Sequence, residues 1–432
     1  GHDKERHDPC AATCTEDGYW GSYYTCKREG CDYSSKVDRY VEKALGHNLK
    51  HHEAKQADCL PGWEAYDECQ REGCDYSTKV EIPANGKHSY VCDVCTTCNG
   101  LNPVKYTRDG DNIYFGYWPQ TLERDETVVA KLNEIAGTPP LPRDKENPYN
   151  WESHEGTTYM WQKIVIYNGT KYLGVQMNDY RASGVYSLRS YIMKNGYFTF
   201  EVYWFKYEPI KWKILTTSGN SAFIMSDIAL DSFSMQPDRK GENRDGLYAS
   251  YNNSTGVPDG TYANNWEYCF LRQWLNETFY NEVFNGLQKE IIKTMKLDNS
   301  ARSCNPNDYP NYYGYGENAG KNKFADQCKD TDDKIFLLSL RDITTTAYGF
   351  NKDVKAEDPK RNLQATDFAK LHGAPMNTND KKYVTWYTRS PAPANGNQGY
   401  ATFVHDRHAK GAIDSIDLVP DGGVVPALWI TL

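Results

Sequence analysis

A three-cysteine repeat near the N-terminal end constrains the fold of this chain more than any other feature. The segment CKREGCDYSSKV begins at Cys26 and returns as CQREGCDYSTKV at Cys69, 43 residues later, with two differences in twelve positions. Upstream of the two copies lie Cys14 and Cys59, each followed by glycine and aromatic residues. A third, shorter unit, HSYVCDVCTTC, begins at His88. Any fold of this segment therefore has to accommodate closely spaced cysteines.

The odd number of cysteines per repeat favours a metal over disulfides. Three cysteines cannot all pair within one unit, whereas three thiolates and one imidazole form a common four-coordinate zinc set. The repeats consist mostly of charged residues, Tyr and Gly, and segments of this size need a metal or disulfides to fold. We therefore expect structural zinc, with disulfides and disorder as the alternatives.

The expected ligand sets stay within each repeat, and each set fills all four zinc positions, which leaves no catalytic position. The expected ligands are Cys14, Cys26, Cys31 and His47 in repeat 1 (residues 1–50), and His52, Cys59, Cys69, Cys74, His88, Cys92, Cys95 and Cys98 in repeat 2 with the short unit (residues 51–100). His7 is the alternative to His47, and His88 is the alternative to His52. Cys10 is left over, and Gly1-His2 is interpreted as a cut end or a cloning remnant.

Composition restricts the partners. The net charge of −9 argues against nucleic acid, which requires a basic face. No stretch approaches the ~20 apolar residues that span a bilayer, so no transmembrane segment is expected. The 34 Tyr and 11 Trp residues supply the kind of side chain that binding surfaces use, because rigid rings give contact area at a small entropic cost.

The rest of the chain, residues 104–432, predicts one domain of strands and short helices. The apolar closing run from Gly422 to Leu432 is expected to be a strand, because an apolar terminus is unlikely to be left free, and its expected partner is Ile113–Pro119. Apolar spacing predicts a helix over Asn265–Phe279. Asn168-Gly169 is the favoured two-residue turn of a β-hairpin. Pro209 is expected to divide the run 197–215 into two strands.

Several segments of this domain resemble a known family. FGYWPQT, YWFKYEPIKWKIL, DDKIFLLSL, TDFAK, WYTRSP and GGVVPALWI occur in the order seen in the bacterial domain of unknown function DUF6273. The sequence departs from that family at Thr388, where Leu is usual, and at Val425, where Arg is usual. The resemblance covers about residues 104–432.

The resemblance implies an α+β fold: a C-type-lectin-like domain with long loop inserts, related to formylglycine-generating enzymes. The preceding segment, about residues 7–98, resembles the short Cys/His repeats of surface proteins from gut-dwelling Firmicutes. We therefore expect the lectin-like domain to be preceded by small zinc-ribbon-like repeats.

The expected ligand-binding residues lie mainly on a Tyr-rich loop. They are Tyr309, Tyr312, Tyr313, Tyr315, Trp386 and Arg389, although a pairing of Arg389 with a buried acid is the favoured alternative. No catalytic residue is assigned. The weaker candidates are an acid/base cluster at His405, Asp406 and His408, a buried thiol at Cys269, a disulfide between Cys304 and Cys328, and a calcium loop at Asp326–Asp333.

Taken together, these features predict a non-catalytic, adhesin-like binding protein that is secreted or displayed on the bacterial cell surface. Its expected partner is a host protein, such as immunoglobulin or mucin, or a glycan, bound by the aromatic polar loops 231–263, 298–331 and 391–411. One alternative is an enzyme on a formylglycine-generating-enzyme-like scaffold. The other is a structural stalk module.

Overall fold

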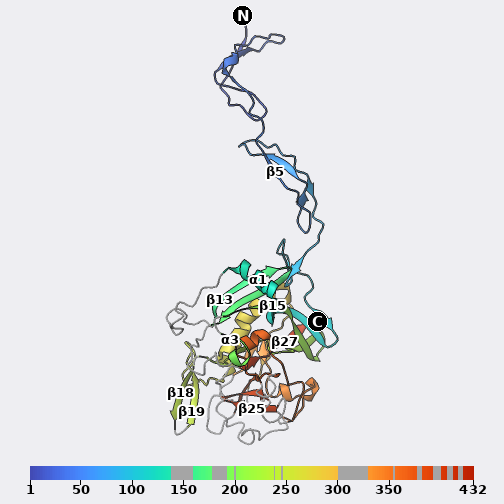
Figure 1. Cartoon of the computed structure of the whole chain (residues 1–432), viewed down its shortest axis with the longest axis vertical. Helices are drawn as coiled ribbons and strands as arrows, with labels where there is room; N and C mark the ends of the chain where they lie inside the picture. The colour runs from blue at the N-terminus through green and yellow to red at the C-terminus, as the bar shows by residue number, and fades with distance from the viewer. Residues whose placement is uncertain are drawn as a thin grey trace. The chain divides into compact units, whose positions relative to one another are not determined.

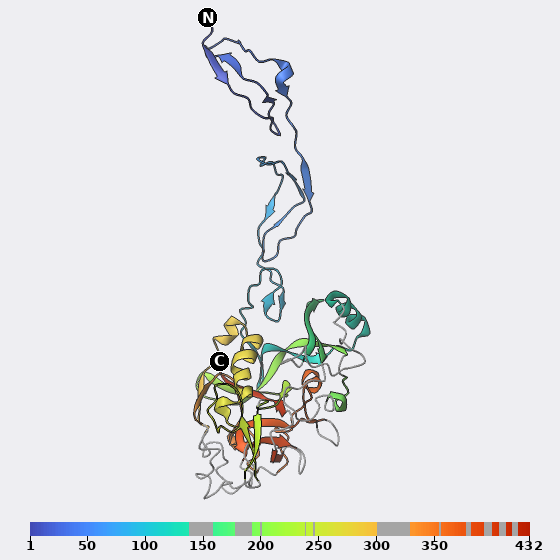
Figure 2. The same ribbon diagram turned by 90° about the vertical axis from the view of Figure 1, so that its left-hand side faces the viewer.

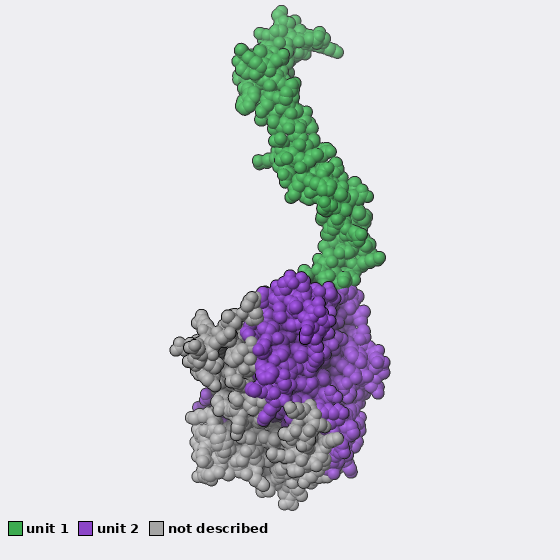
Figure 3. Space-filling view, viewed as in Figure 1, with its two compact units in different colours: residues 1–89, 95–100 green, residues 90–94, 101–432 purple. Residues whose placement is uncertain are grey.

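The structure is a computed structural model of the 432-residue chain. The residues it describes are 1–137, 159–177, 192–198, 201–237, 239–244, 247–299, 329–353, 356–376, 382–392, 400–405, 412–416 and 422–432. They fall into two compact units, coloured separately in Figure 3. Unit 1 comprises Gly1–Ser89 and Cys95–Gly100, and unit 2 comprises Tyr90–Val94 and Leu101–Leu432.

Unit 1 is built from short antiparallel strand pairs that repeat. β1 pairs with β3 and β5 pairs with β7, and the two pairs place Cys26 opposite Lys4 and Cys69 opposite Leu49. Its elements are β1 (Lys4–His7), β2 (Gly18–Tyr19), β3 (Tyr23–Cys26), η1 (Asp38–Tyr40), β4 (Val41–Glu42), β5 (Leu49–His52), β6 (Gly62–Trp63), β7 (Tyr66–Cys69) and β8 (Glu81–Ile82). The next two strands are β9 (Tyr90–Val91), which belongs to unit 2, and β10 (Val94–Cys95), which spans the unit boundary.

These strands have little apolar material to hold them together. Neither of the two hydrophobic clusters found among the described residues contains a residue before Tyr106. Strands of two to four residues, without a core, are not stable on their own. Unit 1 therefore depends on cross-links other than hydrophobic packing.

Unit 2 is organised around an eight-stranded sheet with the order β11-β12-β15-β16-β27-β22, to which β14 adds beside β15 and β13 beside β14. Its strands are β11 (Thr107–Asp109), β12 (Asn112–Leu122), β13 (Tyr159–Tyr167), β14 (Thr170–Met177), β15 (Val202–Thr217), β16 (Ser221–Ser226), β22 (Phe336–Leu337) and β27 (Pro426–Thr431). The Asn168-Gly169 turn, with φ of 48° and 74°, joins β13 to β14 as predicted.

The closing run forms a strand as predicted, but its expected partner is wrong. β27 pairs with β16 and β22, whereas the strand that contains Ile113–Pro119, β12, pairs with β11 and β15. The two strands share one sheet and are separated by β15 and β16. The physical reason is the hairpin of β15 and β16, which joins neighbours in sequence and fills the space between them.

Pro209 does not end a strand. β15 runs through it for 16 residues, and Pro209 faces Tyr117 just after an irregularity in the pairing of β12. Gly116, with φ of 69°, lies at this irregularity. A bulge is one of the few places in a sheet where a residue without an N–H group is tolerated.

The other strands of unit 2 form a five-stranded sheet, in the order β17-β26-β23-β24-β25, and two isolated pairs. The strands of the second sheet are β17 (Asp231–Phe233), β23 (Trp386–Ala392), β24 (Tyr400–His405), β25 (Ala412–Ile416) and β26 (Gly422–Val424). The isolated pairs are β18 (Arg239–Arg244) with β19 (Leu247–Asn252), and β20 (Met295–Leu297) with β21 (Thr331–Asp333).

The helices of unit 2 are short. They are α1 (Glu126–Ala136), η3 (Trp266–Tyr268), α3 (Phe270–Trp274), the π-helical turn η4 (Leu275–Phe279), α4 (Tyr280–Val283), α5 (Gly286–Lys289), η7 (Asp342–Thr344), η8 (Thr346–Tyr348) and α7 (Asp367–Leu371). The helix predicted over Asn265–Phe279 is thus present as η3, α3 and η4, with the Asn265 side chain accepting a bond from the Glu267 N–H. No helix of the described ranges is long and apolar enough to cross a membrane.

The α3–α4 segment, yellow in Figures 1 and 2, packs on the large sheet. Phe279 is fully buried, and its ring lies 5.2 Å from the rings of both Trp118 on β12 and Trp274 on α3. Phe368 on α7 contacts Trp118 from another side, with ring centroids 6.0 Å apart. The sheet, the helices and the second sheet therefore share one large apolar core.

Candidate metal centres and a ligand cavity

Three groups of cysteine and histidine side chains converge in unit 1. We name them the N-terminal centre, the middle centre and the C-terminal centre. They consist of His2, Cys26 and Cys31, of Cys14, His47, Cys69 and Cys74, and of Cys59, His88, Cys95 and Cys98. Within each centre the candidate ligand atoms all lie within 4.8 Å of one another.

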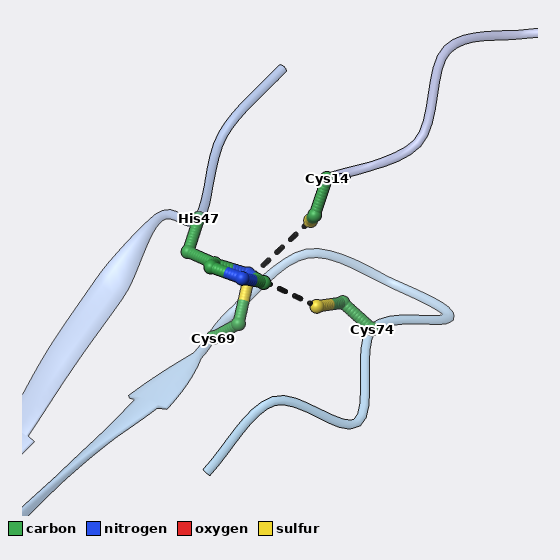
Figure 4. A group of neighbouring side chains, drawn as sticks. All are labelled: Cys14, His47, Cys69 and Cys74. Atoms are coloured by element: carbon green, nitrogen blue, oxygen red, sulfur yellow. Dashed lines mark hydrogen bonds between the residues drawn. The ribbon is translucent and has the colours of Figure 1, made fainter. Parts of the chain in front are cut away.

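The middle centre has the dimensions of a tetrahedral zinc site. The Sγ atoms of Cys14 and Cys69 are 3.7 Å apart, and Cys74 Sγ lies 3.4 Å from His47 Nδ1. A zinc tetrahedron with Zn–S bonds of about 2.3 Å and Zn–N bonds of about 2.0 Å has edges of about 3.8 Å between sulfurs and about 3.5 Å from sulfur to nitrogen. Figure 4 shows the four side chains pointing toward a common point.

The C-terminal centre repeats this geometry. Cys59 Sγ and Cys95 Sγ are 3.6 Å apart, and Cys98 Sγ lies 3.4 Å from His88 Nδ1. All eleven described cysteines are free thiols, and a sulfur–sulfur distance of this size is far longer than the disulfide bond of about 2.05 Å. Both donor sets, three thiols and an imidazole, are therefore compatible with a metal ion such as zinc.

The repeated CxREGC segment supplies two of the ligands through a tight turn. Gly73 adopts φ of 79° and the equivalent Gly30 adopts 76°, a region that side-chain-bearing residues rarely enter. In both turns the second cysteine donates its N–H to an arginine carbonyl, from Cys74 to Arg71 at 3.1 Å in the second copy. The turn thereby brings both thiols of the pair to one side.

Backbone donors prepare some of these thiols for metal binding, because the thiolate is the ligand. Hydrogen bonds from the backbone N–H groups of Cys98 and Thr97 lower the pKa of Cys95 to about 5. Burial acts to raise the pKa of Cys69, but the N–H of Arg71 and the His47 side chain outweigh it and lower this pKa to about 6. Both shifts favour the thiolate, the form that binds a metal.

Cys14 and Cys59, which complete the two four-ligand centres, have raised pKa values instead. Burial, followed by contacts with two neighbouring thiols, raises the pKa of Cys14 to about 12, and the same causes raise that of Cys59 to about 12. A divalent cation at the shared point would remove this repulsion and favour the thiolates. Four protein ligands leave no position for a reactive water, so these centres suit a structural role.

The ligands do not group by repeat as the sequence analysis expected. Cys14 lies with His47, Cys69 and Cys74 rather than with Cys26 and Cys31. Cys59 likewise lies with the short third unit, at His88, Cys95 and Cys98. Each four-ligand centre therefore combines a cysteine pair with a histidine and a further cysteine from earlier in the chain, and in the middle centre both of these, Cys14 and His47, come from residues 1–50. The physical reason is that Cys14 and Cys59 lie on loops away from the CxREGC turn of their own repeat.

Three other residues expected at the metal lie elsewhere. His52 stacks on Tyr66 with ring centroids 4.5 Å apart, and its alternative counterpart, His7, stacks on Tyr23 at 4.6 Å. Cys92 belongs to unit 2 and joins none of the three centres, and burial raises its pKa to about 11.

His2 is the ligand that the sequence analysis missed. Its ring stacks on Tyr33 at 4.1 Å, as that of His47 stacks on Tyr76 at 4.1 Å. Its Nδ1 lies 3.4 Å from Cys31 Sγ. The signal was present, because Gly1-His2 matches Gly46-His47 at a spacing of 45 residues. The Gly-His pair is therefore a feature of the repeat, as the cysteines are.

Unit 2 contains a cavity of about 680 Å³ between the large sheet and the helices. Eight of the fourteen residues in its wall are apolar or aromatic and six are charged or polar: Trp118, Pro119, Gln162, Lys163, Ile164, Lys171, Leu173, Tyr207, Asp231, Phe270, Trp274, Thr278, Glu282 and Phe368. Lys171 Nζ lies over the Tyr207 ring, 4.1 Å from its centroid. A π-helical turn, η4, contributes to the wall, and such turns often occur at functional sites.

Two carboxylates give the cavity its electrostatic character. Partial burial, opposed by Lys171 and assisted by the charge of Asp231, raises the pKa of Glu282. Asp231 itself is buried and hydrogen-bonded to His372 Nδ1. No pattern in the sequence points to this cavity, because its wall combines residues from several strands and helices.

The expected ligand-binding residues do not gather at this cavity. Tyr309, Tyr312, Tyr313 and Tyr315 lie outside the described residues, as do Cys304, Cys328, Asp406 and His408. Trp386 is fully buried, and its indole N–H donates to the Arg361 carbonyl at 3.0 Å. Arg389 Nη1 lies 2.9 Å from Asp342 Oδ2, the ion pair considered as its alternative.

The weaker candidates are in structural surroundings where they are described. Cys269 is buried, and its thiol contacts the Trp266 carbonyl at 3.6 Å. In the proposed calcium loop, Asp333 is fully buried and accepts bonds from Arg272 Nε at 2.6 Å and from the Trp266 indole at 2.8 Å. For His405 only the backbone is described, at the end of β24.

These features define a class of protein: a sheet-rich mixed domain preceded by Cys/His repeats with metal-site geometry. Residues 219–432 match the model of DUF6273, a domain of unknown function, which confirms the resemblance over this part of the chain. The match begins within the region from 104 that the resemblance was expected to cover. No curated protein and no solved structure matches the chain significantly.

Proposed function

We propose that this is a non-catalytic binding protein whose C-type-lectin-like unit 2 recognises a ligand outside the cell. In this proposal the protein is secreted or held on the bacterial surface. Unit 1 binds structural zinc at its four-ligand centres and acts as a metal-stabilised spacer. This combination suits an adhesin, in which one segment acts as a spacer and another binds the ligand.

The observation that carries the proposal is the cavity of unit 2. Its volume, about 680 Å³, falls within the range of about 300–1,000 Å³ typical of small-molecule sites. A wall in which apolar and aromatic side chains form the majority, with polar groups that can orient a ligand, is also typical of such sites. Tyr207 and Phe270, both partly exposed, present ring surface to the cavity.

The chemistry of the cavity favours a glycan. The apolar faces of a sugar ring pack on aromatic rings, and its hydroxyl groups can donate to the Asp231 and Glu282 carboxylates and accept from the Lys171 ammonium. A concave site suits one or two sugar residues better than the flat surface of a folded protein. An epitope on a host protein, such as immunoglobulin or mucin, is the other outcome of the test.

The test is a glycan array probed with the full chain, with cavity variants as controls. We expect Tyr207→Ala and Phe270→Ala each to weaken binding at least about tenfold, since burying a large apolar side chain against a ligand contributes about 1.5–3 kcal/mol. Tyr114→Ala, a partly exposed tyrosine of the same sheet outside the cavity, is expected to bind as the parent does. Equal binding by all variants would place recognition elsewhere.

One observation favours an enzyme as the second candidate. Asp231 lines the cavity while it holds His372, and Glu282 with its raised pKa stands on the same wall. Groups with shifted pKa values in a cavity are characteristic of acid/base chemistry. A glycan that the array identifies should be incubated with the parent and with Glu282→Gln. Product formed by the parent and lost in the variant would establish the enzyme, and an unchanged glycan would support binding alone.

A further inference from the structure

A second cavity of unit 2 lies beside the helical segment that also lines the cavity of about 680 Å³, here called the first cavity. The second cavity has a volume of about 470 Å³, and Phe270 lines both cavities. Along the helical segment, Trp274 and Glu282 line the first cavity, whereas Gln273 and Glu277 line the second. Because neighbouring residues on a helix face different directions, the two cavities lie on adjacent sides of this segment.

The wall of the second cavity is more polar than that of the first. Eight of its fourteen described residues are charged or polar, against six of fourteen in the first cavity. The charged ones are Glu267, Glu277 and Arg272. Arg272 is already engaged, because its Nε donates to Asp333 Oδ1 at 2.6 Å and its Nη1 donates to the Glu267 carbonyl at 2.9 Å. The described wall therefore has an excess of negative charge.

The Glu267 side chain is the part of this wall that lacks a partner. The backbone of Glu267 is held on both sides, because its N–H donates to the Asn265 side chain at 3.0 Å and its carbonyl accepts from Arg272. Its side-chain Oε2 atom, in contrast, is buried and has no hydrogen-bond donor among the described residues. A buried carboxylate oxygen without a donor is unfavourable. A ligand that brings a positive charge and N–H groups would compensate it.

An ammonium group fits this carboxylate better than a metal ion does. Calcium takes about six to eight oxygen ligands. Among the described residues, Glu267 belongs to no group of three or more candidate metal ligands. An ammonium group requires less, because it can donate to one carboxylate and to nearby hydroxyl groups. It is also attracted to the face of an aromatic ring, and Tyr268 belongs to the same wall.

We infer that the second cavity binds the free amino group of an amino sugar, within a glycan whose neighbouring residues occupy the first cavity. This inference rests on the function proposed above for the first cavity. The hydroxyl-bearing residues Ser254 and Thr255 line the second cavity and can exchange hydrogen bonds with sugar hydroxyls, which a lysine side chain lacks. Phe270 provides an apolar surface that the two cavities share. N-acetylation of the sugar removes its positive charge and with it the attraction to Glu267.

The experiment measures the affinity of the full chain for three sugars by NMR titration: methyl β-glucosaminide, its N-acetyl form and methyl β-glucoside. We expect the glucosaminide to bind at least about tenfold more tightly than the other two, because it alone carries an ammonium group. Glu267→Gln keeps the shape of the side chain and removes its charge, so the three sugars should then bind equally. Glu134→Gln, at an exposed carboxylate of α1 outside both cavities, is the matched control and should keep the preference.

Tyr207→Ala separates this inference from the proposed function. Tyr207 lines the first cavity and not the second, so this variant should lose binding on the glycan array and keep the preference for the glucosaminide. Unchanged array binding with the preference kept would remove the proposed function and leave the second cavity as an amino-sugar site of its own. Equal affinities in the parent, or a preference that survives Glu267→Gln, would overturn the inference.

A lysine derivative tests the source of the ammonium group. Nα-acetyl-lysine amide carries the same charged group without sugar hydroxyls, so it should bind at least about tenfold more weakly than the glucosaminide. Equal or tighter binding of this compound would assign the second cavity to a protein side chain and overturn the amino-sugar assignment.

Discussion

The staggered ligation of unit 1 makes a prediction that zinc stoichiometry can decide. Cys14→Ala should remove the ion of the middle centre, although Cys14 belongs in sequence to the first repeat. Adding Cys69→Ala, in the same centre, should change nothing further. Adding Cys59→Ala instead should also remove the ion of the C-terminal centre, since Cys59 closes that centre.

The magnitude follows from the ligand geometry. The Cys14 and Cys69 sulfurs are 3.7 Å apart around one point, so each substitution disrupts the same site. Structural zinc contributes about 10–16 kcal/mol of apparent binding free energy in small domains, far more than any other interaction in a unit without a core. The Cys14 and Cys69 substitutions should therefore be strongly non-additive, whereas independent sites add to within about 0.3–0.5 kcal/mol.

The assay is native mass spectrometry of chains equilibrated with zinc and then treated with a competing chelator. Cys10→Ala is the matched control, because Cys10 is a cysteine of the same loop region that joins no centre. It should retain both resistant ions. Ligation within each repeat predicts the reverse pattern: Cys14 and Cys26 would then share one ion, and Cys14→Ala with Cys69→Ala would lose two. That pattern would refute the staggered arrangement.

Three stability predictions concern unit 2 and are measured by denaturant unfolding. Phe279→Ala should lower the free energy of unfolding by about 3–5 kcal/mol, because it removes a fully buried ring. The control, Phe198→Ala at an exposed position, should lower it by less than about 0.5 kcal/mol. Asp125→Ala should cost about 1 kcal/mol, because its carboxylate caps α1 through the N–H groups of residues 127 and 128. Burial acts to raise the pKa of Asp367, but the Leu122 N–H, Lys370 and Arg124 lower it overall. Asp367→Asn should therefore lower the free energy of unfolding by about 1–2 kcal/mol at pH 7. This difference should fade as the pH falls below about 4.

For each of these three substitutions, one result would contradict the expectation. A cost below about 1 kcal/mol for Phe279→Ala would mean that the surrounding rings collapse into the space. An unchanged free energy for Asp125→Ala would mean that water replaces the cap. The sign for Asp367 follows from its lowered pKa: the carboxylate stabilises the fold above its unfolded pKa and loses that effect on protonation. A difference between parent and Asp367→Asn that is constant with pH would contradict this.

The sequence predicts local structure and local chemistry well. The helical segment Asn265–Phe279, the Asn168-Gly169 turn and the use of the cysteines in clusters with histidine all follow from a few neighbouring residues, whose physical preferences do not depend on the rest of the fold. The apolar closing run likewise predicts a strand, β27, because an alternating apolar segment is stable only when its apolar face is buried.

What the sequence does not predict is which distant segments meet. The apolar faces of β12, β16 and β22 are chemically similar, so the composition of these strands does not predict which of them pairs with β27. The same holds for Cys14, because tetrahedral zinc accepts any thiolate that reaches it, and loop spacing does not identify the repeat that supplies it. The ligand cavity is the extreme case, since Tyr207 and Glu282 become neighbours only through packing.

The overlap of the two four-ligand centres along the chain has a mechanical consequence. With metal bound, one centre closes the chain between Cys14 and Cys74 and the other closes it between Cys59 and Cys98, so the two closed loops share residues 59–74. Under tension, rupture at the middle centre alone would release at most the segment between residues 14 and 59, a length of up to about 160 Å at about 3.3–3.6 Å per residue, because residues 59–74 stay within the other closed loop. The neighbouring centre would remain closed, so the segment would lengthen in steps set by metal–sulfur bonds, and the zinc concentration around the protein would set its extensibility.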